Sequence, residues 1–121
     1  MKILVVDDSG TMRRVIVGSL NSLGYSDVLE ASDGLEAQLV LDENKNINLI
    51  LVDWNMPNMN GYEFLQIVKK NEAFKRIPII MITTEAEKEN VLKAIRAGAS
   101  NYIIKPFVKD VLAAKIKATF S

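Results

Sequence analysis

The chain has 121 residues, of which 49% are hydrophobic and 25% charged, a composition typical of one soluble globular domain. It contains no cysteine and no histidine, which excludes disulfide scaffolds, thiol catalysis, Ser-His-Asp catalysis and zinc sites built from those side chains. Its formal net charge is zero and its apolar runs are far shorter than a membrane span, so we expect a cytoplasmic protein that binds neither nucleic acid nor membranes.

The first half of the chain alternates strand and helix signals. We predict a buried strand over 3–6, a more polar one over 28–31 and an almost wholly apolar one over 47–52. Between them, apolar residues at helical spacing predict two amphipathic helices, the first ending at Gly24 and the second running over 35–43. The inward positions that we predict are Met12, Val15, Ile16, Leu20 and Leu23 in the first helix, and Leu35, Leu39 and Val40 in the second.

The second half repeats this alternation. A loop that contains Pro57 leads to a third helix, a strand over 79–82 and a fourth helix that Gly98 ends. A short strand over 102–104 and a last helix complete the chain. The inward positions that we predict are Gly61, Phe64, Leu65 and Val68 in the third helix, Val91, Leu92 and Ile95 in the fourth, and Val108, Val111, Leu112, Ile116 and Phe120 in the last.

Strands that alternate with helices predict an α/β fold with a parallel sheet covered on both faces. The continuously apolar strands belong in the centre, and the polar second strand and the short fifth strand belong at the edges. We therefore expect a doubly wound (βα)5 fold of the flavodoxin-like kind, with five parallel strands in the order 2-1-3-4-5. No linker or low-complexity segment divides residues 1–121, so we expect one domain.

Three acidic residues follow two of the predicted central strands. Asp7 and Asp8 come after the first strand and Asp53 after the third, so they meet at the switch point where open α/β sheets bind ligands. Carboxylates this close repel one another unless a cation lies between them, and an all-oxygen site suits Mg²⁺ or Mn²⁺. Helix capping by Asp8 or Ser9 is the alternative, but it leaves the doubled acid and its neighbour unexplained.

Two further polar groups reach the same edge of the sheet. Thr83 ends the fourth strand, and Lys105, followed by Pro106, ends the fifth. A hydroxyl and an ammonium beside metal-binding carboxylates suit an incoming phosphoryl group, and one carboxylate can act as the nucleophile. The bond before Pro106 is a candidate cis peptide bond. We place Arg13 and Arg14 on the exposed face of the first helix.

These motifs together resemble the receiver domain of two-component response regulators, and the resemblance spans the chain. Residues 5–9, 53–61 and 98–102 are similar to the single-domain chemotaxis regulators of that family. The resemblance implies that residues 1–121 form one receiver domain that signals through a changed binding surface. It also implies that the chain catalyses only its own phosphorylation and dephosphorylation, and is otherwise not an enzyme.

The resemblance implies a phosphoacceptor and a metal site. Asp53 is the expected phosphorylation site. Asp8 is expected to ligate Mg²⁺ directly and Asp7 through water, with Asp53 and the backbone carbonyl of Asn55 completing the ligands that the protein supplies. Mn²⁺ is a possible substitute.

The resemblance also implies a switch and partners. Thr83 and Lys105 are expected to bind the phosphoryl group, and Tyr102 is expected to turn inward on activation together with Thr83. The partners would be a chemotaxis histidine kinase as phosphoryl donor, a flagellar motor switch protein as target and possible phosphatases, with the chain itself a monomer. The second half of the chain is basic, and the partner face expected there comprises Lys88, Val91, Tyr102, Lys115 and Lys117.

Other functions are compatible with parts of the pattern. One alternative is a receiver of another signalling pathway, and a second is a receiver separated from a larger DNA-binding regulator. A phosphatase of the haloacid dehalogenase type needs two acids two residues apart on the first strand, whereas Asp7 and Asp8 are adjacent. A flavodoxin-like electron carrier needs a phosphate-binding loop there, and both carboxylates would repel the flavin phosphate.

Overall fold

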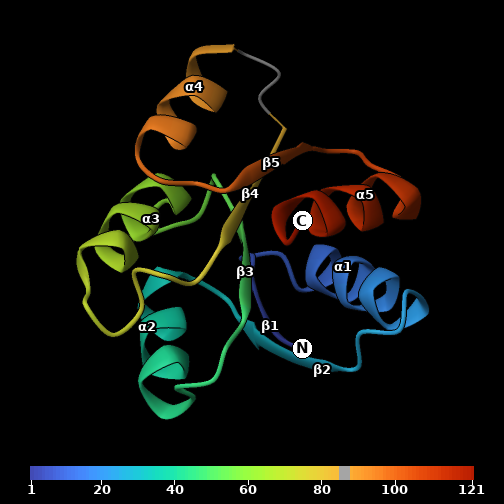
Figure 1. The fold of residues 1–121 in the computed structure, drawn as a ribbon, viewed down its shortest axis with the longest axis horizontal. Coiled ribbons are helices and arrows are strands. Elements are labelled where there is room, and N and C mark those ends of the chain that lie inside the picture. Colours follow the sequence, from blue (N-terminus) through green and yellow to red (C-terminus); the bar gives the residue numbers. More distant parts are fainter. Residues whose placement is uncertain (85–87) are drawn as a thin grey trace.

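One parallel sheet organises the chain. The computed structural model describes residues 1–84 and 88–121, except for the side chain of Lys88. Five strands pair in the order β2-β1-β3-β4-β5, which confirms the predicted fold (Figure 1). Their bounds are β1 (Lys2–Val6), β2 (Asp27–Ala31), β3 (Leu49–Asp53), β4 (Ile79–Thr83) and β5 (Asn101–Ile104).

Helices cover both faces of this sheet. Figure 1 shows α1 and α5 on one face, and α2, α3 and α4 on the other. Within the described residues their bounds are α1 (Gly10–Ser22), α2 (Gly34–Glu43), α3 (Gly61–Lys70), α4 (Lys88–Arg96) and α5 (Lys109–Thr119). None of the described helices is long and apolar enough to cross a membrane.

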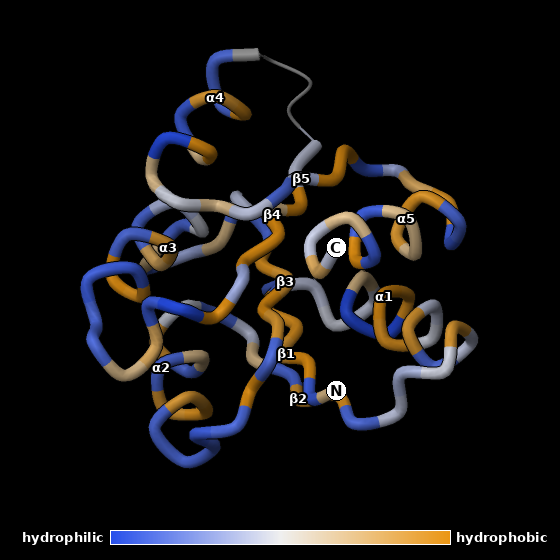
Figure 2. The backbone as a smooth tube through the Cα atoms, viewed as in Figure 1, coloured by the Kyte–Doolittle hydropathy of each residue, from blue (hydrophilic) through white to orange (hydrophobic). Residues whose placement is uncertain are grey.

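Alternate strand residues fill two separate cores. In β1, Leu4 and Val6 pack toward α2, α3 and α4, whereas Ile3 and Val5 pack toward α1 and α5. The same alternation holds in β3 and β4, because successive side chains of a strand point to opposite faces. Figure 2 shows the central strands as the most hydrophobic part of the chain, with hydrophilic residues along the helices.

The predicted inward face is right for α3 and partly wrong for the other helices. All four inward positions predicted for α3 are buried. In α2, Leu39 is 62% exposed, and the buried residues are instead Gly34, Ala37 and Leu41. Small residues let a helix approach a sheet closely. The prediction was wrong because it assumed that the larger apolar residues face the sheet. The other predicted inward residues that are substantially exposed are Val15, Leu35, Leu92, Ile95, Val108, Val111 and Phe120.

Glycines end two helices, as predicted. Gly24 after α1 and Gly98 after α4 have φ angles of +96° and +110°, a left-handed conformation that costs other residues free energy. At the opposite end of α1, Ser9 is the N-cap and its hydroxyl accepts the N–H of Met12 at 3.1 Å. This cap fixes where the chain turns after β1, directly beside the acidic pair.

Candidate functional site

Strand register brings three charged residues to one side of the sheet's carboxyl edge. Asp53 is the last residue of β3, and Asp7 and Lys105 directly follow β1 and β5. Each lies two residues beyond a strand residue that packs toward α1 and α5, namely Val5, Leu51 and Ile103. Because side chains alternate, the three groups share that side and can meet across neighbouring strands.

A nearly buried ion triad results. The Lys105 ammonium lies 3.3 Å from Asp7 Oδ2 and 3.4 Å from Asp53 Oδ2. The side chains of Lys105, Asp7 and Asp53 are only 10%, 1% and 9% exposed. Charges with so little access to water interact strongly, so the triad holds the carboxyl ends of three strands in fixed relation.

Asp8 adds a third carboxylate at the solvent side. One oxygen each from Asp7, Asp8 and Asp53 can be chosen so that all three lie within 4.8 Å of one another. Three carboxylates against the single ammonium of Lys105 leave an excess of negative charge. This arrangement of hard oxygen donors fits a divalent cation such as Mg²⁺.

Burial raises the pKa of Asp53 above its ordinary value. The Lys105 ammonium opposes this shift, the neighbouring Asp7 adds to it, and a hydrogen bond from the backbone N–H of Asn55 lowers the pKa. Desolvation is the largest of these effects, so ionised Asp53 costs the fold free energy. A carboxylate kept at such a cost is typical of a functional site.

We expect Asp53→Asn to raise the stability of the protein at pH 7, by about 3 °C in Tm. The pKa of Asp53 is higher in the folded protein than in the unfolded chain. The stability of the wild type therefore falls as pH rises from the unfolded-state pKa through the folded-state pKa, whereas Asn does not titrate. Urea unfolding of both proteins across pH measures the difference, which should vanish below about pH 4. For the exposed Asp27, changed to Asn as a control, we expect less than about 0.5 kcal/mol. A lower stability of Asp53→Asn at pH 7 would contradict the assignment.

Thr83 and the residues after β5 line the same edge. Thr83 is buried at the end of β4, and its carbonyl oxygen accepts the N–H of Lys105 at 2.7 Å. The peptide bond between Lys105 and Pro106 is cis, as anticipated. The structure thus places Thr83 at the end of β4, beside Lys105 directly after β5.

The turn from β3 into α3 is tightly packed. The backbone N–H of Trp54 donates to Ile82 O at 3.0 Å, and that of Gly61 donates to Trp54 O at 2.8 Å. The Trp54 ring stacks on Tyr62, with ring centroids 5.5 Å apart. Asn60 and Glu63 form a reciprocal capping box at the start of α3. These contacts leave the backbone that follows Asp53 little freedom.

Arg13 is a site neighbour that the sequence analysis placed wrongly. Its side chain is only 22% exposed. Its Nη1 donates to the backbone carbonyl of Asp7 at 2.6 Å, and its Nε lies 3.2 Å from Glu30 Oε1 on β2. Helical side chains lean toward the N-terminus of their helix, so an arginine one turn after Ser9 reaches back to the end of β1. That geometric rule could have identified it. Arg14 is exposed, as predicted.

The predicted partner face lies on α4, β5 and α5. The Lys115 ammonium lies over the Tyr102 ring, 4.3 Å from its centroid. Val91, Tyr102 and Lys115 are half-buried and Lys117 is exposed. Lys88 begins α4, but its side chain lies outside the described residues. Tyr102 therefore joins β5 to α5 through a cation–π contact.

The fold and this acidic edge match one protein family. Residues 3–117 match the response regulator receiver domain, and the chain belongs to that family. The triad and the carboxylate cluster thus occupy the carboxyl edge of a receiver, a class of signalling proteins rather than of conventional enzymes.

The relatives narrow the class further. Chemotaxis protein CheY1 of Helicobacter pylori strain 26695 is 53% identical over 117 residues, covering 97% of this chain and 94% of that protein. Chemotaxis protein CheY of Pseudomonas aeruginosa PAO1 is 42% identical over 120 residues, covering 99% and 96%. These likenesses place the chain among the CheY-type chemotaxis response regulators.

Solved structures agree with this placement. Vibrio cholerae CheY4, crystallised at pH 4.0, superposes with a TM-score of 0.90 at 34% identity, covering 98% of this chain and 97% of the other. The CheY of Borrelia burgdorferi, crystallised in a complex with CheX, BeF3 and Mg²⁺, superposes with a TM-score of 0.94 at 25% identity, covering 100% and 90%.

Proposed function

We propose that Asp53 is the residue through which this receiver accepts a phosphoryl group from a chemotaxis histidine kinase, and that residues 1–121 act as one domain. The observation that carries the proposal is the Lys105 ammonium within 3.4 Å of an Asp53 carboxylate that burial disfavours as an anion. Asp7 also contacts Lys105, but its side chain is only 1% exposed, whereas that of Asp53 is 9% exposed and ends the central strand β3.

The chain's own groups account for the transfer step. An Asp53 carboxylate oxygen forms the new bond to phosphorus while the bond from phosphorus to the donor's imidazole nitrogen breaks, and the imidazole, already protonated by solvent on its other ring nitrogen, leaves as the neutral molecule. In this scheme Lys105 neutralises the charge of the incoming oxygens, and the hydroxyl of the buried Thr83 donates to them. The chain acts on no other substrate in this scheme, and hydrolysis of its own aspartyl-phosphate returns it to the start.

We propose that Asp8, Asp7, Asp53 and the carbonyl of Asn55 hold Mg²⁺, with Mn²⁺ as a substitute. The carboxylate cluster of the first three supports this, and so does the Mg²⁺ in the Borrelia complex. When bound, the ion supplies charge neutralisation to the phosphoryl oxygens. Lys105 alone balances only part of the negative charge, so the site favours a cation before a phosphoryl donor approaches.

We propose that the flagellar motor switch is the target and that Tyr102 links the site to it. Thr83 is the last residue of β4. Tyr102 of β5 pairs with Met81, which lies two residues before Thr83 on β4. A Thr83 hydroxyl drawn toward a phosphoryl group would vacate space on the side where Tyr102 lies, and the ring would turn into it. The CheX partner of the Borrelia relative supports a phosphatase as a further partner.

The experiment is a double-mutant cycle of Thr83→Ala and Tyr102→Phe. We measure the affinity for a motor-switch peptide with the phosphoryl mimic beryllofluoride and Mg²⁺ present. A coupled switch predicts strong binding only with beryllofluoride, and a coupling energy of about 1 kcal/mol or more between the two sites. Additive losses, or binding that ignores beryllofluoride, would leave Tyr102 as a static contact and contradict the proposal.

A further inference from the structure

A groove between α3 and α4 lies apart from the acidic edge and from the predicted partner face. It encloses about 730 Å³ and is lined by four cations and one carboxylate among other residues. Its charged lining residues are Lys69, Lys70, Glu89, Lys93 and Arg96. On α3, the lining residues Lys69 and Lys70 lie at helical spacing from Tyr62 and Gln66, so all four share one face of that helix. The lining residues of α4 also lie at helical spacing, so one face of each helix is turned toward the groove.

The groove also has an apolar part. In α4, Ala94 is buried, but Leu92 and Ile95 are 41% and 42% exposed. Leu92, Ala97 and the Tyr62 ring therefore give the groove an apolar lining that solvent reaches, with a positively charged rim.

The cations differ in how far they are already engaged. Lys69 is held in place, because its ammonium donates to Lys75 O at 3.1 Å and to Ile77 O at 2.9 Å. Lys93 lies over the Tyr62 ring, 4.6 Å from its centroid. Across residues 1–84 and 88–121, no ion pair includes Lys70, Lys93 or Arg96. Three cations at an apolar groove thus lack a carboxylate partner within the described chain.

We propose that this groove binds an acidic segment of a partner protein, with carboxylates at Lys70 and Arg96 and an apolar side chain against Tyr62 and Leu92. Charge complementarity selects the occupant, because a neutral peptide would leave the cations unpaired. α3 spans 10 residues and α4 spans 9, so each helix is about 14 Å long, and a groove that runs between them suits two helical turns of a peptide. Binding here does not require phosphorylation of Asp53.

The chain contains its own reporter of the groove. Its single tryptophan, Trp54, stacks on Tyr62, which lines the groove and carries Lys93 above its ring. A peptide that draws Lys93 away from Tyr62 changes the surroundings of this ring pair. We therefore expect Trp54 emission to change on binding, in parallel with the anisotropy of a labelled peptide.

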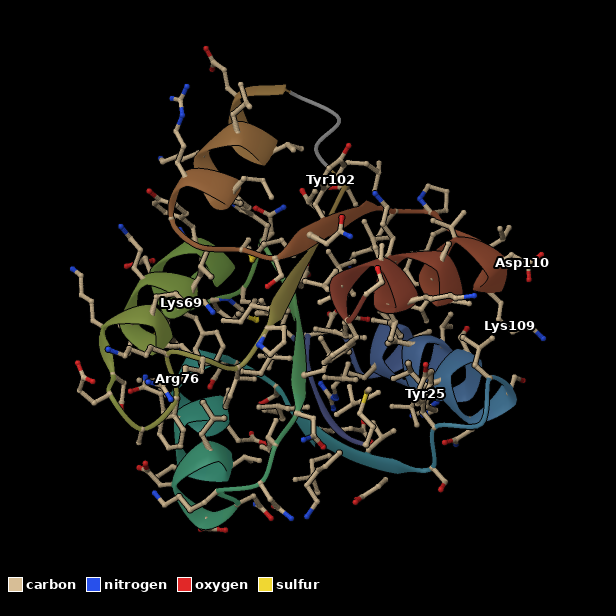
Figure 3. All side chains as sticks on the ribbon, in the orientation of Figure 1. Tyr25, Lys69, Arg76, Tyr102, Lys109 and Asp110 are labelled. Carbon is tan, nitrogen blue, oxygen red and sulfur yellow. The ribbon has the colours of Figure 1, made fainter. Side chains whose placement is uncertain are left out.

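The test uses the whole chain and a peptide of about twelve residues, rich in Glu, with two leucines one helical turn apart. An analogue with Gln in place of every Glu is the neutral peptide. Lys70→Glu combined with Arg96→Glu reverses the charge of the groove's rim. As a control, Arg14→Glu combined with Lys109→Glu makes the same charge change on the opposite face of the protein. Figure 3 shows Lys69 on α3 and Lys109 on α5 on opposite sides of the sheet. Circular dichroism and labelling by acetyl phosphate check that each variant folds, and Lys70→Gln with Arg96→Gln replaces any that does not.

We expect the acidic peptide to bind about tenfold more tightly than the Gln peptide, and the reversed rim to lose about tenfold while the control pair stays near wild type. Salt should weaken binding, because the rim is exposed. Equal losses in both variant pairs, or equal binding of both peptides, would overturn the proposal. So would self-association that depends on the rim, or tighter rim-dependent binding of ATP or polyphosphate, because a second copy or a phosphate compound would then be the occupant.

Discussion

Gly61→Ala is expected to destabilise the protein by about 3 kcal/mol, measured by urea unfolding. A Cβ at this position would collide with the backbone carbonyl oxygen of Asp53, and would lie 3.0 Å from Trp54 Cα. The obstacle is backbone, which cannot turn aside as a flexible side chain does. Gly61 is also fixed by its own N–H, which donates to Trp54 O at 2.8 Å. The substitution therefore displaces the chain that carries Asp53, and phosphoryl labelling should slow as well.

Gly18→Ala is the matched control for this prediction. Gly18 is exposed in the middle of α1, and a Cβ there would meet nothing within 4 Å. Alanine favours helix over glycine, so we expect a gain of about 0.5–1 kcal/mol. If Gly61→Ala were as stable as wild type, the tight junction of β3 and α3 would not be what positions Asp53.

Lys105→Met is expected to cost about 3 kcal/mol of stability at pH 7 and to slow phosphoryl transfer about a hundredfold. Methionine keeps most of the side-chain volume but leaves Asp7 and Asp53 as facing, nearly buried carboxylates without their cation. The pKa of Asp53, already raised by burial, then rises further because Lys105 no longer lowers it. The stability deficit should therefore grow as pH rises above about 4 and Asp53 ionises.

Two comparisons make this result specific. Lys109→Met removes an exposed ammonium at the start of α5, and we expect a change within about 0.5 kcal/mol. Mg²⁺ should raise the Tm of Lys105→Met more than that of wild type, because the variant's carboxylates are less neutralised. A deficit that is constant across pH would mean that Lys105 acts through packing rather than through its charge.

The strand order and the meeting of the acids follow from rules that act on short stretches of sequence. Continuous apolar runs mark central strands, and the right-handed crossover then leaves few arrangements. Because side chains alternate between the two faces along β1, β3 and β5, Asp7, Asp53 and Lys105 reach the same side of the sheet. The sequence alone therefore sufficed to predict where the candidate site lies, although the functional roles of its residues still await experiment.

Side-chain detail was harder to predict, because it depends on packing between elements distant in sequence. The inner face of α2 rests on Ala37 rather than on the larger Leu39, since the sheet admits a small residue there. Arg13 of α1 pairs with Glu30 on β2, a contact between separate elements that no local pattern encodes. The stack of Trp54 on Tyr62 likewise depends on how the turn before α3 closes.

Intact mass after incubation with acetyl phosphate and Mg²⁺ tests the central claim, that Asp53 is the phosphoacceptor of this receiver. We expect wild type to gain one phosphoryl group, and to gain none when a chelator removes the metal. Asp53→Asn should gain none in either condition, although it folds and is more stable than wild type. A phosphoryl group on Asp53→Asn, or none on wild type with Mg²⁺ present, would contradict the account.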